Sequence, residues 1–185
     1  MALKSSVFRT PRGRLIVMAG GMPAESMFLR GFLGAMGGEV EAWFISHPHG
    51  DHMGALLELL RDRQELRIKH IYHSRMPEPV IQAEPDYEAH CREFYAMLDT
   101  LTDIQVTDIQ TAGETFCWDG MNLQILSVAN DFTTNPYNNS SMVMRVWDRR
   151  KSITFLGDAG MECGNKVLNG PYADRLHCDY LQMAH

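Results

Sequence analysis

The chain has 185 residues, of which 45% are hydrophobic and 22% are charged, so it is neither disordered nor fibrous and can bury the core of one domain. Its 17 basic and 23 acidic side chains give a formal net charge of −6. A uniformly acidic chain lacks the broad basic surface of a high-affinity nucleic-acid binder, although bound metal ions could still attract an anionic substrate.

Strands and helices are predicted to alternate in the first half of the chain. Residues 14–18 form a short apolar run that ends at Gly20-Gly21, which is typical of a strand and a turn. Pro23 opens a predicted helix that Gly37-Gly38 ends, and residues 40–46 are a second buried strand. There follow a helix with Asp51 as its N-cap, a strand over 68–72, an exposed loop over 77–85 and a helix over 87–101.

From residue 104 onward the pattern changes to strands. These are expected over 105–106, 115–118, 123–128, 141–147 and 153–156, followed by a helix over 161–168 and a last strand over 180–183. There is no internal repeat, low-complexity tract or linker, so residues 1–185 are expected to form one domain. The order predicts an α/β fold with two sheets flanked by helices.

The most informative segment is Ser46-His47-Pro48-His49-Gly50-Asp51-His52, at the end of the second buried strand. It places three imidazoles and a carboxylate within six consecutive positions. Such ligands suit zinc, manganese or iron, and the absence of nearby thiols argues against a closed structural zinc site. His47 and His49 alternate and can face one ion, whereas Asp51 and His52 more naturally reach a second. We therefore predict a metal site, in preference to histidines that only pack in the core.

The pattern H-x-H-x-D-H after an apolar strand resembles that of the metallo-β-lactamase superfamily, a large group of mostly dinuclear metallohydrolases. Later landmarks follow the order of that family: Asn138-Asn139-Ser140-Ser141 before a strand, Gly157-Asp158 after a strand, and a last strand ending in His185. This set is similar to the soluble hydrolase domain of DNA-uptake competence proteins. The resemblance implies an αββα four-layer sandwich whose C-terminal part is expected to lie beyond residue 185.

The resemblance also implies a ligand set for two divalent ions, with zinc favoured over manganese or iron. His47 and His49 would hold the first ion, Asp51, His52 and His185 the second, and Asp158 would bridge them. Such a pair acidifies a water and neutralises a leaving oxygen. Because Asp51 could also accept a proton, Asp51 and Asp158 are the candidate catalytic residues.

Two positions depart from the family pattern. Ala19 stands where members usually carry an Asp in the turn after the first core strand, which puts tight metal retention in doubt. Asn138 and Asn139 stand where many members supply a His, which suggests a weaker or amide ligand at one metal subsite.

Four residues are candidate substrate contacts. Asn138, Asn139 and Ser140 could orient phosphate oxygens or complete the coordination of an ion, or they could simply form the turn that starts the next strand. His73, after the third strand, could contact substrate at the rim of the site, although a lone histidine is more often structural.

Three functions remain open. A metal-dependent hydrolase acting on a phosphodiester is favoured, because the subgroup it resembles is linked to nucleic-acid and phosphodiester chemistry. The alternatives are hydrolysis of a small ester, thioester or lactam, and a metal-poor binding or scaffolding domain. No apolar run approaches ~20 residues, so no membrane partner is expected. Four scattered cysteines without a C-x-x-C pair favour free thiols in the cytoplasm, and nothing indicates the oligomeric state.

Overall fold

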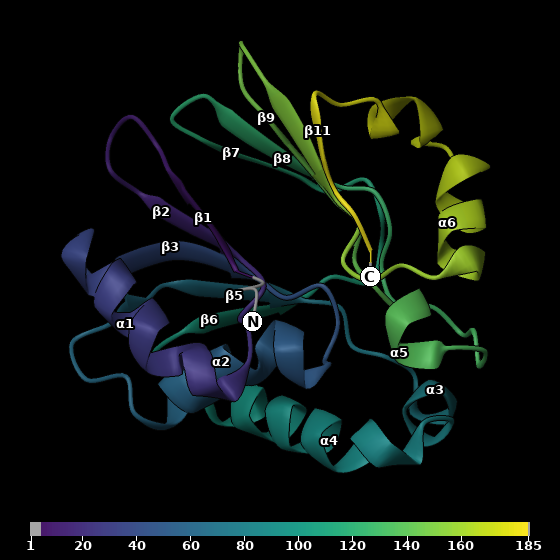
Figure 1. Ribbon diagram of the computed structural model, residues 1–185, viewed down its shortest axis with the longest axis horizontal. Coiled ribbons are helices and arrows are strands. Elements are labelled where there is room, and N and C mark those ends of the chain that lie inside the picture. The colour runs from purple at the N-terminus through teal and green to yellow at the C-terminus, as the bar shows by residue number, and fades with distance from the viewer. Residues whose placement is uncertain (1–4, 185) are drawn as a thin grey trace. The chain divides into compact units, whose positions relative to one another are not determined.

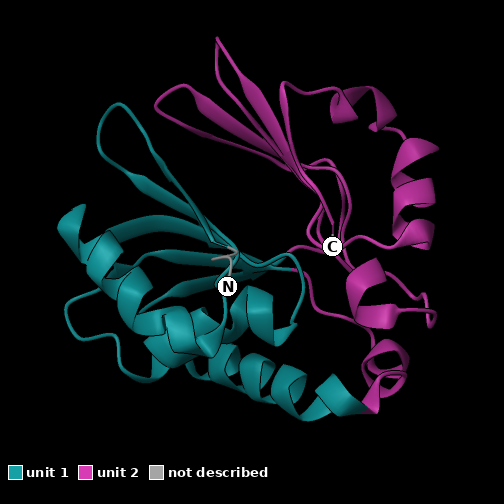
Figure 2. Cartoon of the chain, in the orientation of Figure 1, with its two compact units in different colours: residues 1–73, 86–108 teal, residues 74–85, 109–185 magenta. Residues whose placement is uncertain are grey.

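The computed structural model describes residues 5–184 and divides the chain into two compact units (Figure 2). The first unit extends to residue 73 and also includes residues 86–108, and the second contains residues 74–85 and the chain from 109 onward. Each unit has its own sheet and its own helices. The prediction of an α/β chain with two sheets is confirmed.

The first unit contains a six-stranded sheet in the order β1-β2-β3-β5-β6, with β4 also paired to β3. β1 is antiparallel to β2, whereas β2, β3, β5 and β6 run parallel. All four residues of β2 are buried, as expected of the continuous apolar run in a strand inside a largely parallel sheet. The strands are β1 (Ser6–Arg9), β2 (Leu15–Met18), β3 (Glu39–Phe44), β4 (Arg67–Ile68), β5 (His70–His73) and β6 (Gln105–Asp108).

Three α-helices lie on the same side of this sheet (Figure 1). They are α1 (Ser26–Ala35), preceded by the 3-10 turn η1 (Pro23–Glu25), α2 (Gly50–Arg61) and α4 (Pro85–Thr100). Helix α1 buries Leu29 and Leu33, whereas Met27 and Phe28 are 67% and 65% exposed. The helix predicted after Pro23 is present, but only some of its apolar side chains are buried.

Helix α2 begins one residue before Asp51, so the prediction of Asp51 as the N-cap is wrong. His49 is the N-cap, and its carbonyl accepts the amides of His52 and Met53 at 2.9 Å. Asp51 lies in the first turn, where its charge complements the positive end of the helix. A glycine fixes the position of this turn, because a Cβ on Gly54 would lie 2.5 Å from Cδ of Pro23.

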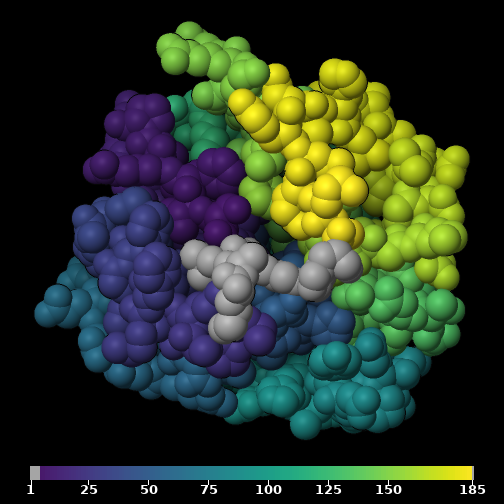
Figure 3. Space-filling view, viewed as in Figure 1, coloured from purple at the N-terminus to yellow at the C-terminus, as the bar shows by residue number. Residues whose placement is uncertain are grey.

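The second unit contains a five-stranded sheet in the order β11-β10-β9-β8-β7, in which only β10 and β11 are parallel. Its strands are β7 (Thr115–Trp118), β8 (Met121–Ile125), β9 (Met144–Trp147), β10 (Ser152–Phe155) and β11 (Tyr180–Gln182). The edge strand β11 lies at the surface, and Tyr180 and Leu181 are 57% and 47% exposed (Figure 3). β9 starts three residues later than predicted, because a short helix and a turn precede it.

The helices of this unit are α3 (Glu78–Gln82), α5 (Pro136–Asn139), α6 (Met161–Leu168) and the 3-10 turn η2 (Ala173–Leu176). Helix α3 replaces the exposed loop predicted over 77–85, because Val80 and Ile81 are buried. Helix α6 packs Cys163 and Val167 into the core, and burial raises the pKa of the Cys163 thiol, so the group stays neutral. Across residues 5–184, no helix is both long enough and apolar enough to cross a bilayer.

Ala19 adopts a left-handed backbone conformation, with φ of +62°. This conformation costs a residue with a Cβ roughly 1–2 kcal/mol. Only main-chain groups of Ala19 make its hydrogen bonds to Phe44 (2.9 Å) and the Trp43 indole (3.1 Å). Ala19→Gly should therefore raise the free energy of unfolding in urea by up to about 1 kcal/mol. The control Ala96→Gly, at an exposed position inside α4, should lower the free energy of unfolding by about 1 kcal/mol. A destabilised Ala19→Gly variant would contradict strain at the Ala19 turn.

Candidate metal centre

The segment from Ser46 to His52 joins strand β3 to helix α2 and is largely buried. The amide of Ile45 donates to the carbonyl of Tyr72 at 3.0 Å, which continues the β3–β5 pairing past the end of β3. His47 and His52 are 1% and 3% exposed. The segment thus leaves the carboxyl end of a central parallel strand, which is where α/β proteins collect functional groups.

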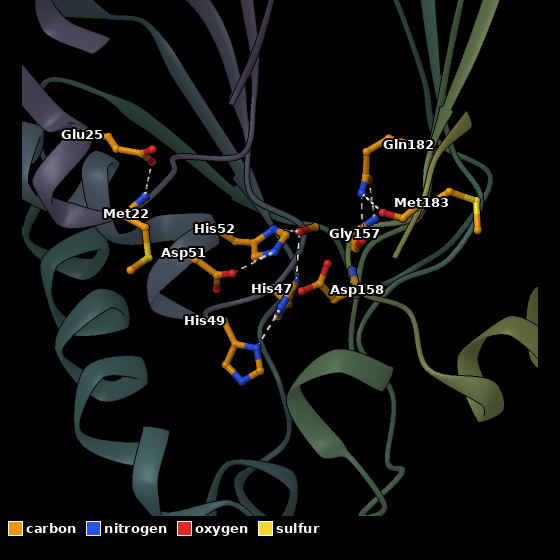
Figure 4. Close-up of polar contacts among 12 residues, drawn as sticks. Met22, Glu25, His47, His49, Asp51, His52, Gly157, Asp158, Gln182 and Met183 are labelled. Carbon is orange, nitrogen blue, oxygen red and sulfur yellow. Dashed lines mark hydrogen bonds and ion pairs between the residues drawn. The ribbon is translucent and has the colours of Figure 1, made fainter. Parts of the chain in front are cut away.

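Three imidazoles and a carboxylate converge in this segment (Figure 4). Nε2 of His47 lies 3.1 Å from Nδ1 of His49. The rings of His47 and His52 lie 4.3 Å apart between centroids, and ligand nitrogens of these two rings lie within 4.8 Å of each other. Oδ2 of Asp51 is 3.9 Å from Nε2 of His52. All four side chains that the motif singled out are therefore neighbours within the first unit.

The donor atoms of this cluster fit a divalent transition metal. Two imidazole nitrogens bound to one tetrahedral zinc at ~2.0–2.1 Å lie about 3.3 Å apart. The 3.1 Å between His47 Nε2 and His49 Nδ1 is close to that separation. The 3.9 Å between Asp51 and His52 is wider, so this pair fits a single ion less closely. Zinc, manganese and iron all accept nitrogen and carboxylate oxygen together.

Two further side chains that sequence reasoning missed contact the histidines. Oγ of Ser46 lies 3.1 Å from Nδ1 of His47 and 3.3 Å from Nδ1 of His52. The ring of Tyr87, which is 42% exposed, lies 4.4 Å from that of His49 between centroids. The position of a hydroxyl directly before the motif was a usable signal for Ser46. Nothing in the sequence linked Tyr87, 38 positions after His49, to the motif.

His73 ends strand β5 and is 3% exposed. Its ring centroid lies 5.7 Å from that of Tyr95 and 6.5 Å from that of Phe94. These aromatic neighbours on α4 favour a packing role for His73. Its contact with substrate stays a prediction.

In the second unit, Asp158 lies in a turn after β10 that is held from two sides (Figure 4). Gly157 has φ of +60°, a conformation that favours glycine. The side-chain amide of Gln182 binds both main-chain groups of Gly157, accepting from its N–H at 3.1 Å and donating to its carbonyl at 3.2 Å. The amide of Asp158 donates to Oγ of Ser141 at 3.1 Å. The main chain that carries this carboxylate is therefore fixed by residues of its own unit.

Asn139, the last residue of α5, is fully buried. Its Nδ2 donates to the carbonyl of Thr134 and to Glu162, both at 2.7 Å. Its Oδ1 accepts the amide of Cys163 at 3.0 Å. These bonds tie α5 to the start of α6, which favours a structural role for this amide.

Asn138 and Ser140 differ from Asn139. The Oδ1 of Asn138 and the Oγ of Ser140 are buried and have no hydrogen-bond partner within residues 5–184. Among the described residues, these two atoms therefore lack the partner that a buried polar group usually has. The last candidate, His185, lies outside the described residues.

The sequence model of the family described as the Metallo-beta-lactamase superfamily matches residues 5–108, which is more than half of the chain. The chain belongs to the metallo-β-lactamase superfamily. The matched region contains the H-x-H-x-D-H segment, and superfamily membership indicates metal-dependent hydrolase activity. The comparison with curated proteins gives no match.

Solved structures share the fold of this chain. A metallo-β-lactamase of Cronobacter sakazakii with a HARLDQ motif is 15% identical, with a TM-score of 0.59 over 99% of this chain and 71% of that one. The subclass B3 metallo-β-lactamase BJP-1 of Bradyrhizobium japonicum is 15% identical, with a TM-score of 0.54 over 98% and 70%. Zn²⁺-bound PqqB of Methylobacterium extorquens is 14% identical, with a TM-score of 0.57 over 97% and 59%. The predicted fold class is confirmed, and the chain spans less than two thirds of PqqB.

The Gly157 turn generates a prediction about metal affinity. Gly157→Ala places a Cβ at φ of +60°, which should cost about 1–2 kcal/mol of stability or shift the turn that carries Asp158. We therefore expect weaker binding of Zn²⁺, measured by competition with a chromophoric chelator, together with a lower midpoint in urea. The control is Gly164→Ala inside α6, where a Cβ meets no atom and should stabilise the helix by about 0.5–1 kcal/mol. Unchanged stability and zinc affinity in Gly157→Ala would show that the turn tolerates a side chain.

Proposed function

We propose that this chain is a metal-dependent hydrolase domain that acts on a phosphodiester. The observation that carries the proposal is the 3.1 Å approach of His47 Nε2 to His49 Nδ1, beside His52 and Asp51. Two buried nitrogens near the separation that one zinc ion requires, beside a third imidazole and a carboxylate, support a metal site, and without an ion the same two nitrogens share a hydrogen bond.

We propose the ligand set that the family resemblance implies. His47 and His49 would hold one divalent ion, Asp51, His52 and His185 would hold a second, and Asp158 would be shared by the two. The main-chain bonds of Gly157 and Asp158 support this role, because they fix the carboxylate's point of attachment. Zinc is the favoured metal, with manganese or iron as alternatives.

When bound, such ions supply an acidified water and a Lewis acid at the scissile group. The residues of this chain position and balance that chemistry. Asp51, in the first turn of α2, can take up the proton that the water loses, and the positive end of the same helix favours an anionic substrate. The buried walls around His47 and His52 exclude bulk water and so strengthen every charge interaction at the site.

Ser140 supports the choice of a phosphodiester. A phosphate group offers several acceptor oxygens, and the buried hydroxyl of Ser140, unpaired within the described residues, has a proton to donate to one of them. The Oδ1 of Asn138, likewise unpaired there, only accepts, so it suits a metal ion or a donor group of the substrate instead. The resemblance to the hydrolase domain of DNA-uptake competence proteins agrees with this substrate class.

Four free cysteines further support a reducing, cytoplasmic environment.

A metal-poor binding domain is the second candidate function, and Ala19 is the observation that favours it. Its methyl group stands in the turn where family members usually carry a carboxylate. This turn therefore lacks the carboxylate that would help to retain a bound ion. Metal analysis of the purified protein separates the two candidates. Near-stoichiometric zinc, manganese or iron supports the hydrolase, whereas no uptake of any of the three supports the binding domain.

The hydrolase proposal predicts that turnover requires the bound metal. Chelator treatment should abolish hydrolysis of bis-p-nitrophenyl phosphate, and added Zn²⁺ or Mn²⁺ should restore it, because the metal supplies the nucleophile. A chromogenic β-lactam and a thioester, assayed in parallel, test the alternative substrate classes. Faster turnover of either would replace the phosphodiester as the proposed substrate.

Asp158→Ala should lower metal-dependent turnover at least ~100-fold, because it removes the bridging ligand. Asp174→Ala, which removes an exposed carboxylate on η2, is the matched control and should keep turnover within about twofold of the parent. Both are measured with bis-p-nitrophenyl phosphate at saturating Mn²⁺. Equal turnover in the two variants would remove Asp158 from the site.

A further inference from the structure

Ser46 lies between two of the imidazoles. Its Oγ is 3.1 Å from Nδ1 of His47 and 3.3 Å from Nδ1 of His52, and the side chain is buried in the first unit. One hydroxyl oxygen therefore contacts the same ring nitrogen of two histidines that are assigned to different ions. A hydroxyl is not a preferred ligand of zinc, so the double contact of Ser46 points to a role beside the metal ligands rather than among them.

The chemistry of the two groups limits the possible arrangements. A neutral imidazole has one N–H and one lone pair, and a metal ion binds the nitrogen with the lone pair. A serine hydroxyl has one proton to donate and two lone pairs that accept. Oγ can therefore accept an N–H from both rings at once, but it can donate its own proton to only one of them.

Each arrangement has a different consequence for the metal ligands. A ring that donates from Nδ1 to Ser46 keeps its lone pair on Nε2, where an ion can bind. A ring that accepts the serine proton on Nδ1 carries its own proton on Nε2, where it blocks the ion. Only the arrangement with two accepted N–H groups leaves both His47 and His52 ready for metal.

We propose that Ser46 is a positioning residue that holds His47 and His52 in the Nδ1–H tautomer and so presents both Nε2 lone pairs to divalent ions. Metal-bound histidines commonly donate their second N–H to an oxygen, and here one oxygen serves two rings. The proposal rests on the proposed function in one respect, since it assigns a use to the Nε2 lone pairs. The tautomers themselves are a property of the metal-free protein, in which Ser46, at hydrogen-bond distance from Nδ1 of His52, must outweigh the Asp51 carboxylate 3.9 Å from Nε2 of that ring.

The proposal also fixes the state of His49 before metal binds. Nε2 of His47 and Nδ1 of His49 lie 3.1 Å apart, so one of them donates to the other. If His47 carries its proton on Nδ1, then its Nε2 accepts and His49 donates from Nδ1. When an ion binds both nitrogens, the proton of His49 must move to its Nε2. Of the three rings, only His49 changes tautomer.

Nitrogen NMR of the ¹⁵N-histidine-labelled, metal-free protein tests the tautomers directly, because protonated and unprotonated ring nitrogens have well-separated shifts. We expect Nδ1–H for His47, His49 and His52, with resonances assigned through single histidine variants. On addition of Zn²⁺, His49 should be the only one of the three rings whose proton moves from Nδ1 to Nε2. An Nε2–H tautomer at His47 or His52 in the metal-free protein would overturn the proposal.

Zinc affinity tests whether the contacts of Ser46 help His47 and His52 to bind metal. Ser46→Ala should bind Zn²⁺ about 10–100-fold more weakly in competition with a chromophoric chelator, because the rings lose the acceptor that orients them. Ser46→Thr keeps the hydroxyl and should retain the affinity and the tautomers of the parent. Ser127→Ala, which removes another buried hydroxyl, is the matched control and should leave both unchanged.

The outcomes separate this proposal from the proposed function. Equal zinc affinity in Ser46→Ala and the parent, or unchanged tautomers in Ser46→Ala, would overturn the role of Ser46. A parent protein that binds no metal would overturn the hydrolase function, and the tautomers of the metal-free protein would still decide whether Ser46 orients the rings. Zinc binding without diester turnover would leave Ser46 supported and the proposed substrate refuted.

Discussion

The burial of three imidazoles at the carboxyl end of β3 is the constraint on which the rest of the first unit depends. A buried polar ring costs free energy unless its nitrogens have partners. Here Ser46 partners two Nδ1 atoms, and His47 and His49 partner each other. A core would be more stable with apolar side chains at these positions. A metal ion that binds several lone pairs at once provides the physical reason for keeping them.

Close approach of the main chain fixes the spacing of these rings. The amide of Gly20 donates to the carbonyl of His52, and that of Ala55 donates to the carbonyl of Gly21 at 2.9 Å. The start of helix α2 thus lies against the turn after β2. Pro23 packs against Gly54, in the space that a side chain at position 54 would occupy. Because the histidines stand on both sides of the helix start, any shift of α2 would change the separation of His47 and His52.

The second unit holds its candidate ligand by different means. The side chains of Gln182 and Ser141 bind the main chain around Gly157 and Asp158, and Asn139 ties α5 to α6 beside them. The hydrogen bonds within each unit therefore hold the main chain beside the candidate ligands of that unit. The fold by itself does not select a reaction, because solved structures at about 15% identity share only this scaffold. The reaction depends on the side chains that the scaffold carries.

The sequence by itself determined the metal motif and the alternation of strands and helices, because both are local patterns, and the order of the elements together with the family resemblance gave the fold class. Four ligand-type residues within six positions need no tertiary contact to be recognised, and α6 is found over 161–168 as predicted. Only the tertiary structure decided the helix that replaces the loop over 77–85, the contact of Tyr87 with His49 and the clamp of Gln182 on Gly157. The last two features depend on side chains 25 or more positions apart, and the helix depends on the burial of Val80 and Ile81 by distant elements. Periodicity in the sequence does not reveal contacts between residues so far apart.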